Sequence, residues 1–285
     1  MAWDVTGKTI LVTGATSGIG LEASVLFARK GATVVMVGRD GKKTESCVAL
    51  VKERSGSQAV RSLLCDFTRQ ADIRKLAAEV LQTCPQIQVL VNNAGTVFPE
   101  RTLTPDGIES TFAVNHLGYF LLTNLLLERI VQSAPARIVN VASQGHYRGT
   151  LDFDDLGFAR GGYGVMAAYS RSKLGNVLFT NELARRLAGK GVTVNSLHPG
   201  AVATNIWSHG PRWAAPIIKY LLSWFFISAA KGGENLARLA LAPELDGVTG
   251  KYFDQQNEKT ASARALDEAL AKKLWTASEE MTQAR

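Results

Sequence analysis

Short runs of apolar and β-branched residues alternate with amphipathic stretches over most of the chain. The amphipathic stretches repeat apolar residues at three- and four-residue spacing, which is typical of helices. The apolar runs predict strands at residues 9–13, 33–37, 59–65, 89–92, 137–141 and 192–197. The pattern therefore predicts a series of strand–helix–strand units.

Several predicted strands, such as ILVTG and VLVNN, are apolar at nearly every position. We expect helices to cover them on both faces, as in parallel sheets. The prediction is one domain, residues 1–285, built on a Rossmann-type doubly wound parallel sheet of about seven strands. Right-handed crossovers bring the carboxyl ends of these strands to one edge, where ligands bind.

The pattern loosens after the sixth strand, where residues 201–227 are rich in aromatic side chains and interrupted by prolines. We predict a helical substrate lid here, with Trp207 and Trp213 lining an apolar pocket and a helix beginning near Pro216. Ordinary packing of that helix and shallow membrane contact through residues 214–227 stay open as alternatives.

A final helix is predicted over residues 263–281 from a buried apolar stripe, which consists of Leu266, Leu270, Leu274, Ala277 and Met281. We expect it to pack on the edge of the domain, and a contact within a homo-oligomer is the alternative.

Composition narrows the class of protein. A hydrophobic fraction of 46% supports one sizeable core. Cys47, Cys65 and Cys84 are odd in number and lack the spacing of metal or redox motifs, so we expect free thiols in a reducing compartment and no metal site. The start of the chain lacks a secretory pattern, and the apolar stretch 214–230 contains Pro216 and Lys219. These features predict a cytoplasmic protein.

The formal net charge of +7 raises the question of a nucleic-acid partner. The basic residues are dispersed, and none of the basic runs is interleaved with aromatic side chains. The sequence therefore favours a small anionic cofactor over nucleic acid.

A glycine-rich turn follows the first predicted strand and opens a helix. Glycines at such a turn let the backbone approach a pyrophosphate, which the helix N-terminus also attracts. The pattern G-x3-G-x-G predicts a dinucleotide site whose residues are Gly14, Thr16, Ser17, Gly18, Ile19 and Gly20.

The end of the second strand bears on the choice of dinucleotide. Gly38 stands where an acidic residue would bind the ribose hydroxyls of NAD(H), and Arg39 offers a fixed positive charge to a 2′-phosphate. We therefore expect NADP(H) to be favoured over NAD(H). Asp40 keeps NAD(H) open as an alternative, although Lys42 and Lys43 can offset its charge.

Tyr169 and Lys173 lie four residues apart in a helical stretch, so they share one face. A phenol with a pKa of about 10 is a weak acid–base group at neutral pH, and we expect the neighbouring ammonium to lower that pKa. Tyr169 can then act as general acid/base. Ser143 follows the fifth strand, where its hydroxyl can bind a carbonyl oxygen that gains charge.

The glycine pattern, the NNAG turn at 92–95, the YxxxK motif and the PG pair at 199–200 together resemble the short-chain dehydrogenase/reductase family. The resemblance covers nearly the whole chain. It implies catalysis by Asn115, Ser143, Tyr169 and Lys173, with Asn115 holding a water against the lysine.

The same resemblance implies the remaining cofactor contacts. Tyr169 and Lys173 contact the cofactor as well as the substrate, and Asp66 contacts the adenine, although a turn or capping role for Asp66 stays open. The other implied contacts are Phe67, Asn93, Ala94, Gly95, Pro199, Gly200, Val202 and Thr204.

Residues 146–168, between Ser143 and Tyr169, form a longer connection than in the shortest members of the family. With the stretch VNHLGYF around Asn115, this connection resembles the retinol dehydrogenase and protochlorophyllide reductase branch. That branch acts on lipophilic aldehydes, ketones and alcohols, and the chain is similar to it without a hydrophobic N-terminal anchor. Alternatives are an NAD-dependent alcohol dehydrogenase, a sugar-nucleotide epimerase and a non-catalytic dinucleotide-binding regulator.

Overall fold

The fold is given by a computed structural model, which describes residues 3–201 and 227–283. Its strands form one sheet in the order β3-β2-β1-β4-β5-β6-β7-β8. All neighbouring strands are parallel except β7 and β8, which are antiparallel. The strands are β1 (Thr9–Thr13), β2 (Thr33–Gly38), β3 (Val60–Leu64), β4 (Val89–Asn92), β5 (Ala136–Val141), β6 (Val192–His198), β7 (Tyr252–Asp254) and β8 (Asn257–Glu258).

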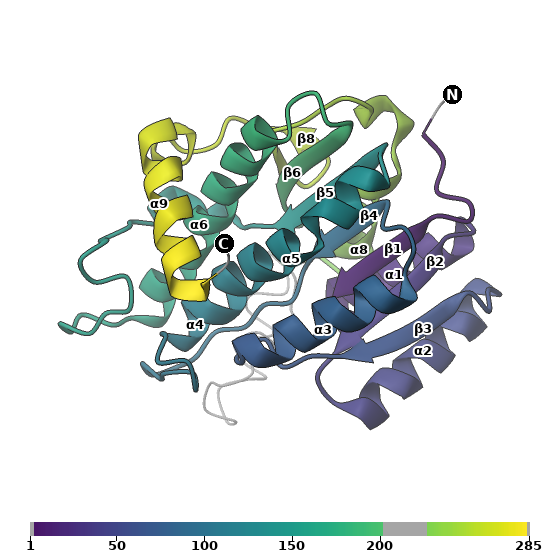
Figure 1. Ribbon diagram of the computed structural model, residues 1–285, viewed down its shortest axis with the longest axis horizontal. Helices are drawn as coiled ribbons and strands as arrows, with labels where there is room; N and C mark the ends of the chain where they lie inside the picture. The colour runs from purple at the N-terminus through teal and green to yellow at the C-terminus, as the bar shows by residue number, and fades with distance from the viewer. Residues whose placement is uncertain (1–2, 202–226, 284–285) are drawn as a thin grey trace.

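Helices cover both faces of this sheet. One face carries α1 (Gly18–Arg29), α2 (Gly41–Ser55) and α8 (Ala229–Leu241). The other carries α3 (Gln70–Thr83), α5 (Gly118–Gln132) and α6 (Val165–Arg186). Figure 1 shows α3 and α5 in front of the sheet and α8 behind it.

Shorter elements complete the described chain. They are α4 (Ser110–Phe112), the π-helical turn η1 (Ala113–Leu117), and three 3-10 helices, η2 (Gln144–Arg148), η5 (Pro243–Leu245) and η6 (Ala263–Leu266). The last helix, α9 (Glu268–Thr282), packs beside α6.

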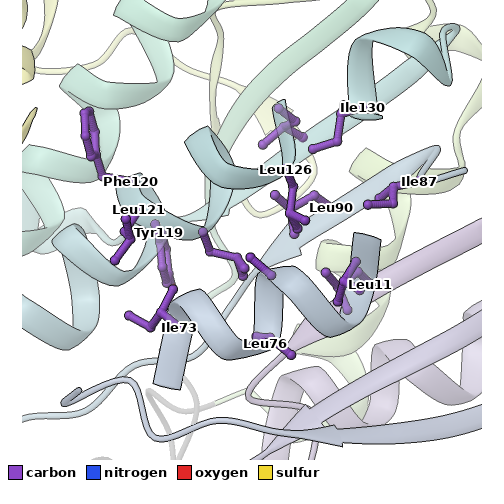
Figure 2. Close-up of a cluster of buried hydrophobic side chains, with 14 of the residues drawn as sticks. Leu11, Ile73, Leu76, Ile87, Leu90, Tyr119, Phe120, Leu121, Leu126 and Ile130 are labelled. Atoms are coloured by element: carbon purple, nitrogen blue, oxygen red, sulfur yellow. The ribbon is translucent and has the colours of Figure 1, made fainter. Parts of the chain in front are cut away.

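Alternation along each strand divides the core into two layers. Leu11 and Leu90 point to the α3 and α5 side, where they meet Leu76 and Leu126 (Figure 2). Their neighbours on β1 and β4, such as Ile10, point to the α1 and α8 side. Because both faces are buried, the strands are apolar at nearly every position.

The predicted fold class is confirmed, and the six strands expected from the sequence lie within one residue of their predicted bounds. The sequence analysis gave no residue range for the two short strands β7 and β8. β7 and β8 are joined by a tight turn in which Gln255 has a φ of 57°. With three and two residues, these strands are too short for an alternation pattern to reveal them.

The prediction of one helix over residues 263–281 is wrong at its start. The 3-10 turn η6 comes first, and α9 begins at Glu268. Asp267 separates the two because its carboxylate accepts a hydrogen bond of 2.9 Å from the Leu270 N–H and caps α9. Leu266, expected on the buried stripe, is 51% exposed.

Most of the predicted lid, with Trp207, Trp213 and the helix near Pro216, lies outside the described residues. Its two ends lie together, because the Ile227 N–H donates a hydrogen bond of 2.8 Å to the Ala201 carbonyl.

The contact between α1 and α8 depends on Gly233. A Cβ atom at Gly233 would lie 2.5 Å from the Glu22 Cβ and 3.0 Å from the Ala23 backbone nitrogen. We expect Gly233→Ala to lower the free energy of unfolding by about 1–3 kcal/mol, because the helices must separate. Urea unfolding measures this change, and Gly41→Ala is the control.

A Cβ at Gly41 would meet only Leu64, at an ordinary 3.6 Å, in the first turn of α2. Gly41→Ala should therefore be neutral or slightly stabilising. Equal stability of the two variants would contradict the close helix contact.

Candidate active site

The turn between β1 and α1 has no room for side chains at two of its glycines. A Cβ at Gly14, where φ is 64°, would lie 2.7 Å from the Ala94 Cα, and one at Gly20 would lie 2.5 Å from the Gly14 carbonyl oxygen. Ser17 is the N-cap residue of α1, yet its side chain makes no capping hydrogen bond. The turn thus presents bare backbone and a helix N-terminus that no side chain caps, the surroundings a pyrophosphate favours.

The loops after β1 and β4 are hydrogen-bonded to each other. The Thr13 hydroxyl accepts hydrogen bonds from the N–H groups of Asn93 and Ala94 at 2.9 and 3.0 Å. The Asn93 amide donates back to the carbonyls of Thr13 and Gly14 at 2.9 and 3.1 Å. Sequence reasoning missed Thr13, although a hydroxyl ending an apolar strand was a usable signal.

The end of β2 carries the groups expected to select the dinucleotide. Arg39 is exposed and forms no hydrogen bond or ion pair with the described residues. Asp40 caps α2 by accepting a hydrogen bond of 2.8 Å from the Lys43 N–H, which engages one of its carboxylate oxygens. A Cβ at Gly38 would lie 2.5 Å from the Thr16 methyl group and 2.2 Å from the Thr44 hydroxyl, so an acidic side chain does not fit there without rearrangement.

Asp66 lies two residues after the end of β3 and stabilises the turn that follows. Its carboxylate accepts hydrogen bonds from the N–H and hydroxyl of Thr68 at 2.9 and 2.8 Å. Phe67 is buried against Gly118, where a Cβ would lie 2.7 Å from the phenyl ring.

Ser143 and Tyr169 meet at the carboxyl end of β5. Ser143 is the N-cap residue of η2, and its hydroxyl accepts a hydrogen bond of 3.1 Å from the Gly145 N–H. The two side chains lie close together, because a Cβ atom at Gly145 would be 3.5 Å from the Ser143 hydroxyl and 3.4 Å from the Tyr169 ring.

Lys173 is buried one helical turn after Tyr169 on α6. Its ammonium donates a hydrogen bond of 2.9 Å to the Val141 carbonyl and lies 5.7 Å from the centre of the Tyr169 ring. Lys173 forms no ion pair within the described part of the chain. Burial lowers the pKa of Lys173 to about 7.

The expected lowering of the Tyr169 pKa by this lysine is not found. Burial raises the pKa of Tyr169 above its ordinary value, and the neighbouring Ser143 side chain opposes the rise only in part. In the ligand-free protein, burial disfavours the charged form of each of the two groups.

Asn115 lies in the π-helical turn η1, between α4 and α5. Its amide nitrogen donates to the Thr96 carbonyl at 2.9 Å and to the Ser172 hydroxyl at 3.1 Å, and its carbonyl oxygen accepts from the Thr96 N–H at 2.8 Å. Both amide hydrogens are therefore engaged, and a water at Asn115 would have to bind one of its oxygen atoms. The sequence predicted Asn115 as a site residue but did not predict the π turn. Such turns are frequent at functional sites.

The loop after β4 passes over these residues. A Cβ at Gly95 would lie 3.3 Å from the Asn115 side-chain oxygen and 3.8 Å from the Lys173 ammonium. The structure thus brings together the four residues expected to be catalytic. Pro199 and Gly200 follow β6, and the Pro199 carbonyl accepts a hydrogen bond of 2.9 Å from Asn235. Val202 and Thr204 lie outside the described residues.

Two other kinds of feature were sought over residues 3–201 and 227–283. Within these ranges, His, Cys, Asp and Glu side chains do not form a group of three or more that could hold a metal ion. Nor is any helix there both long enough and apolar enough to cross a membrane.

Comparisons with known proteins agree with this geometry. Residues 8–214 match the family model for short chain dehydrogenase. Human retinol dehydrogenase 13 is 40% identical over 278 residues, which cover 96% of this chain and 84% of the relative. Mouse retinol dehydrogenase 14 is 42% identical over 290 residues, covering 96% and 86%.

A crystal structure of an uncharacterised protein from Mycobacterium paratuberculosis has the same fold. It superposes with a TM-score of 0.79 at 31% sequence identity, covering 99% of this chain and 98% of that one.

The buried lysine makes a prediction about stability. With a pKa of about 7 in the folded protein against an ordinary 10.5, the charged form of Lys173 disfavours folding. This penalty is complete below about pH 7 and fades as the pH rises toward the unfolded value. We expect Lys173→Met to raise the melting temperature of the ligand-free protein by at least about 2 °C at about pH 6.

The gain should shrink when melting is measured at about pH 9. Lys190 is exposed, so Lys190→Met serves as the control. The difference in melting temperature between this variant and the wild type should be the same at both pH values. A gain for Lys173→Met that is the same at both pH values would contradict the low pKa of the lysine.

Proposed function

Because the chain belongs to the short-chain dehydrogenase/reductase family, in its retinol dehydrogenase-like branch, it is an oxidoreductase that acts on CH–OH donors. On this premise we propose that it uses NADP(H) to interconvert a lipophilic aldehyde or ketone and the corresponding alcohol. The observation that carries the proposal is the cluster of Ser143, Tyr169 and Lys173 on the same sheet edge as the glycine turn.

The residues around that turn suit a dinucleotide. Gly14 and Gly20 leave the backbone bare, and no side chain caps α1, which suits a pyrophosphate. Arg39 supports NADP(H), because its guanidinium is exposed and unengaged by the described residues, and crowding at Gly38 disfavours an acid there. When bound, the nicotinamide supplies or accepts the hydride.

Three side chains handle the carbonyl oxygen and its proton. Tyr169 donates a proton to the oxygen during reduction and removes it from the alcohol during oxidation. Ser143 donates a hydrogen bond to the same oxygen as negative charge builds on it. Lys173, when protonated, stabilises the Tyr169 phenolate that reduction leaves behind.

Burial makes the charge on Lys173 sensitive to pH near neutrality, since its pKa is about 7. A water bound to an oxygen of Asn115 would connect the lysine to solvent and restore the proton after each turnover. This path for the proton, from solvent through the water to Lys173, is part of the proposal. Both amide hydrogens of Asn115 are engaged by protein groups, so the water is expected to donate to Asn115 rather than accept from it.

The substrate class is proposed from the relatives and from the rim of the site. The two relatives compared above are named as retinol dehydrogenases, and retinol is a lipophilic alcohol. Met166, three residues before Tyr169 on α6, is 51% exposed and offers an apolar surface on the same helix. Four expectations stay predictions from the sequence. They are the cytoplasmic location, the lid over 201–227, the membrane contact through 214–227 and the homo-oligomer.

The proton donor can be tested by Tyr169→Phe, which removes only the phenol oxygen. We expect kcat for NADPH-dependent reduction of a lipophilic aldehyde to fall at least about a hundredfold, the usual scale of general acid catalysis. The dissociation constant for NADPH, measured by fluorescence titration, should stay close to that of the wild type. Near-normal turnover by the purified variant would show that another group donates the proton.

The cofactor preference can be tested by Arg39→Asp. A carboxylate there would face the 2′-phosphate, so kcat/KM with NADPH should fall at least about tenfold while kcat/KM with NADH changes little. Lys42→Asp makes the same change of charge nearby, on the first turn of α2, and should have a smaller effect. Wild-type efficiency with NADH equal to that with NADPH would overturn the proposed preference.

A further inference from the structure

His146 is a fully buried histidine that the proposed chemistry does not use. It lies in η2, three residues after Ser143 and beneath the site. Its ring packs against the rings of Tyr147 and Tyr252, with centroids 4.0 and 4.6 Å away. A buried imidazole needs partners for both nitrogens, and these partners define what the residue does.

The two partners of the ring fix its tautomer. Nδ1 lies 2.7 Å from the Ser143 carbonyl oxygen, and a carbonyl only accepts, so Nδ1 carries the hydrogen. Nε2 lies 3.2 Å from the Ser262 backbone nitrogen, and an amide N–H only donates, so Nε2 is bare. Burial also lowers the pKa of His146, which keeps the ring neutral.

The same contacts hold Ser143 in place. Its backbone is extended, with φ −165° and ψ 159°, and the following turn is a short 3-10 helix. Two groups of His146 hold the Ser143 carbonyl, the ring at 2.7 Å and the backbone N–H at 3.1 Å. Because the Cα–Cβ bond of Ser143 moves with its backbone, these contacts restrict where the Ser143 side chain can point.

We propose that His146 is a positioning residue of the carbonyl-reducing site, whose neutral ring ties Ser143 to the segment at Ser262 and so aims the Ser143 hydroxyl. It does not touch the reacting atoms and acts through Ser143 alone. This inference rests on the proposed function, because the hydroxyl that it positions is the proposed ligand of the carbonyl oxygen.

Two variants separate the two contacts of the ring. The amide of an asparagine can donate from near the Nδ1 position, so His146→Asn keeps the hydrogen bond to Ser143. The longer glutamine reaches the Nε2 position instead, so His146→Gln keeps the contact with Ser262. We expect kcat to fall at least about tenfold in His146→Gln and less than about threefold in His146→Asn, with the dissociation constant for NADPH unchanged in both.

Tyr147→Phe is the matched control. The Tyr147 hydroxyl donates a hydrogen bond of 2.7 Å to the Thr260 carbonyl, so it joins the same two segments without contacting Ser143. This variant should keep the wild-type kcat. A loss equal to that of His146→Gln would mean that general loosening of η2, and not the Ser143 contact, sets the rate.

A double-mutant cycle tests the route of the effect. In the Ser143→Ala background, His146→Gln should change kcat by less than about twofold, because the group that it positions is gone. A further loss of about tenfold there would overturn the proposal, as would wild-type turnover by His146→Gln.

A spectroscopic measurement keeps this inference apart from the proposed function. Long-range proton–nitrogen NMR of the labelled wild type should show His146 as the Nδ1–H tautomer, whether or not a substrate is found. The Nε2–H tautomer would overturn the inference while leaving the dehydrogenase assignment intact. If the protein reduces no carbonyl substrate but His146 is the Nδ1–H tautomer, the result would count against the proposed function. It would not count against the hydrogen bond from His146 to Ser143.

Discussion

The Thr13 hydroxyl holds together the two loops on which the site depends. β1 and β4 are neighbours at the point where the strand order reverses, so the loops that follow them diverge to opposite faces and leave a crevice. Hydrogen bonds between Thr13 and Asn93 hold the starts of the two loops against each other. Gly14 and Gly20 are glycines because the two loops then approach too closely for any Cβ atom.

The proposed catalytic residues include a group that lowers local stability, because the charge on Lys173 is disfavoured by burial. Lys173 is held by one carbonyl and the faces of Tyr119 and Tyr169, without a carboxylate from the described residues. An acidic partner would stabilise its charge but would also compete with the phenolate for the ammonium. The surrounding core, packed on both faces of the sheet, tolerates this local cost.

Sequence alone located the sheet well because its strands are buried on both faces, and their apolar runs are therefore unmistakable. The four proposed catalytic residues were found through motifs whose order matches the family. The π turn at Asn115 and the break at Asp267 were missed. The break had a local signal, because Asp is a favoured N-cap residue and its carboxylate binds the N–H three residues on, whereas no residue pattern in the sequence marks a π turn. Neighbouring charge also suggested the wrong direction for the Tyr169 pKa, since burial cannot be read from spacing.

The contacts of the His146 ring with Ser143 and Ser262 could not be predicted from the sequence for a related reason. Its second partner, Ser262, lies 116 residues along the chain, and no local pattern links the two. For Thr13 the sequence shows a hydroxyl at the end of an apolar strand, but not its partners in the loop after β4, which are distant in sequence. Sequence therefore identified the groups proposed to do chemistry better than the groups that hold them.

The last helix has a consequence for how the protein is made. α9 covers α6, and its Trp275 lies against Phe179, while the Ser278 hydroxyl contacts the His116 ring beside Asn115. Translation delivers α9 after every described residue of the proposed site. The nascent chain must therefore keep the apolar side of α6 uncovered until α9 has emerged, a period in which chaperone binding and aggregation compete with folding.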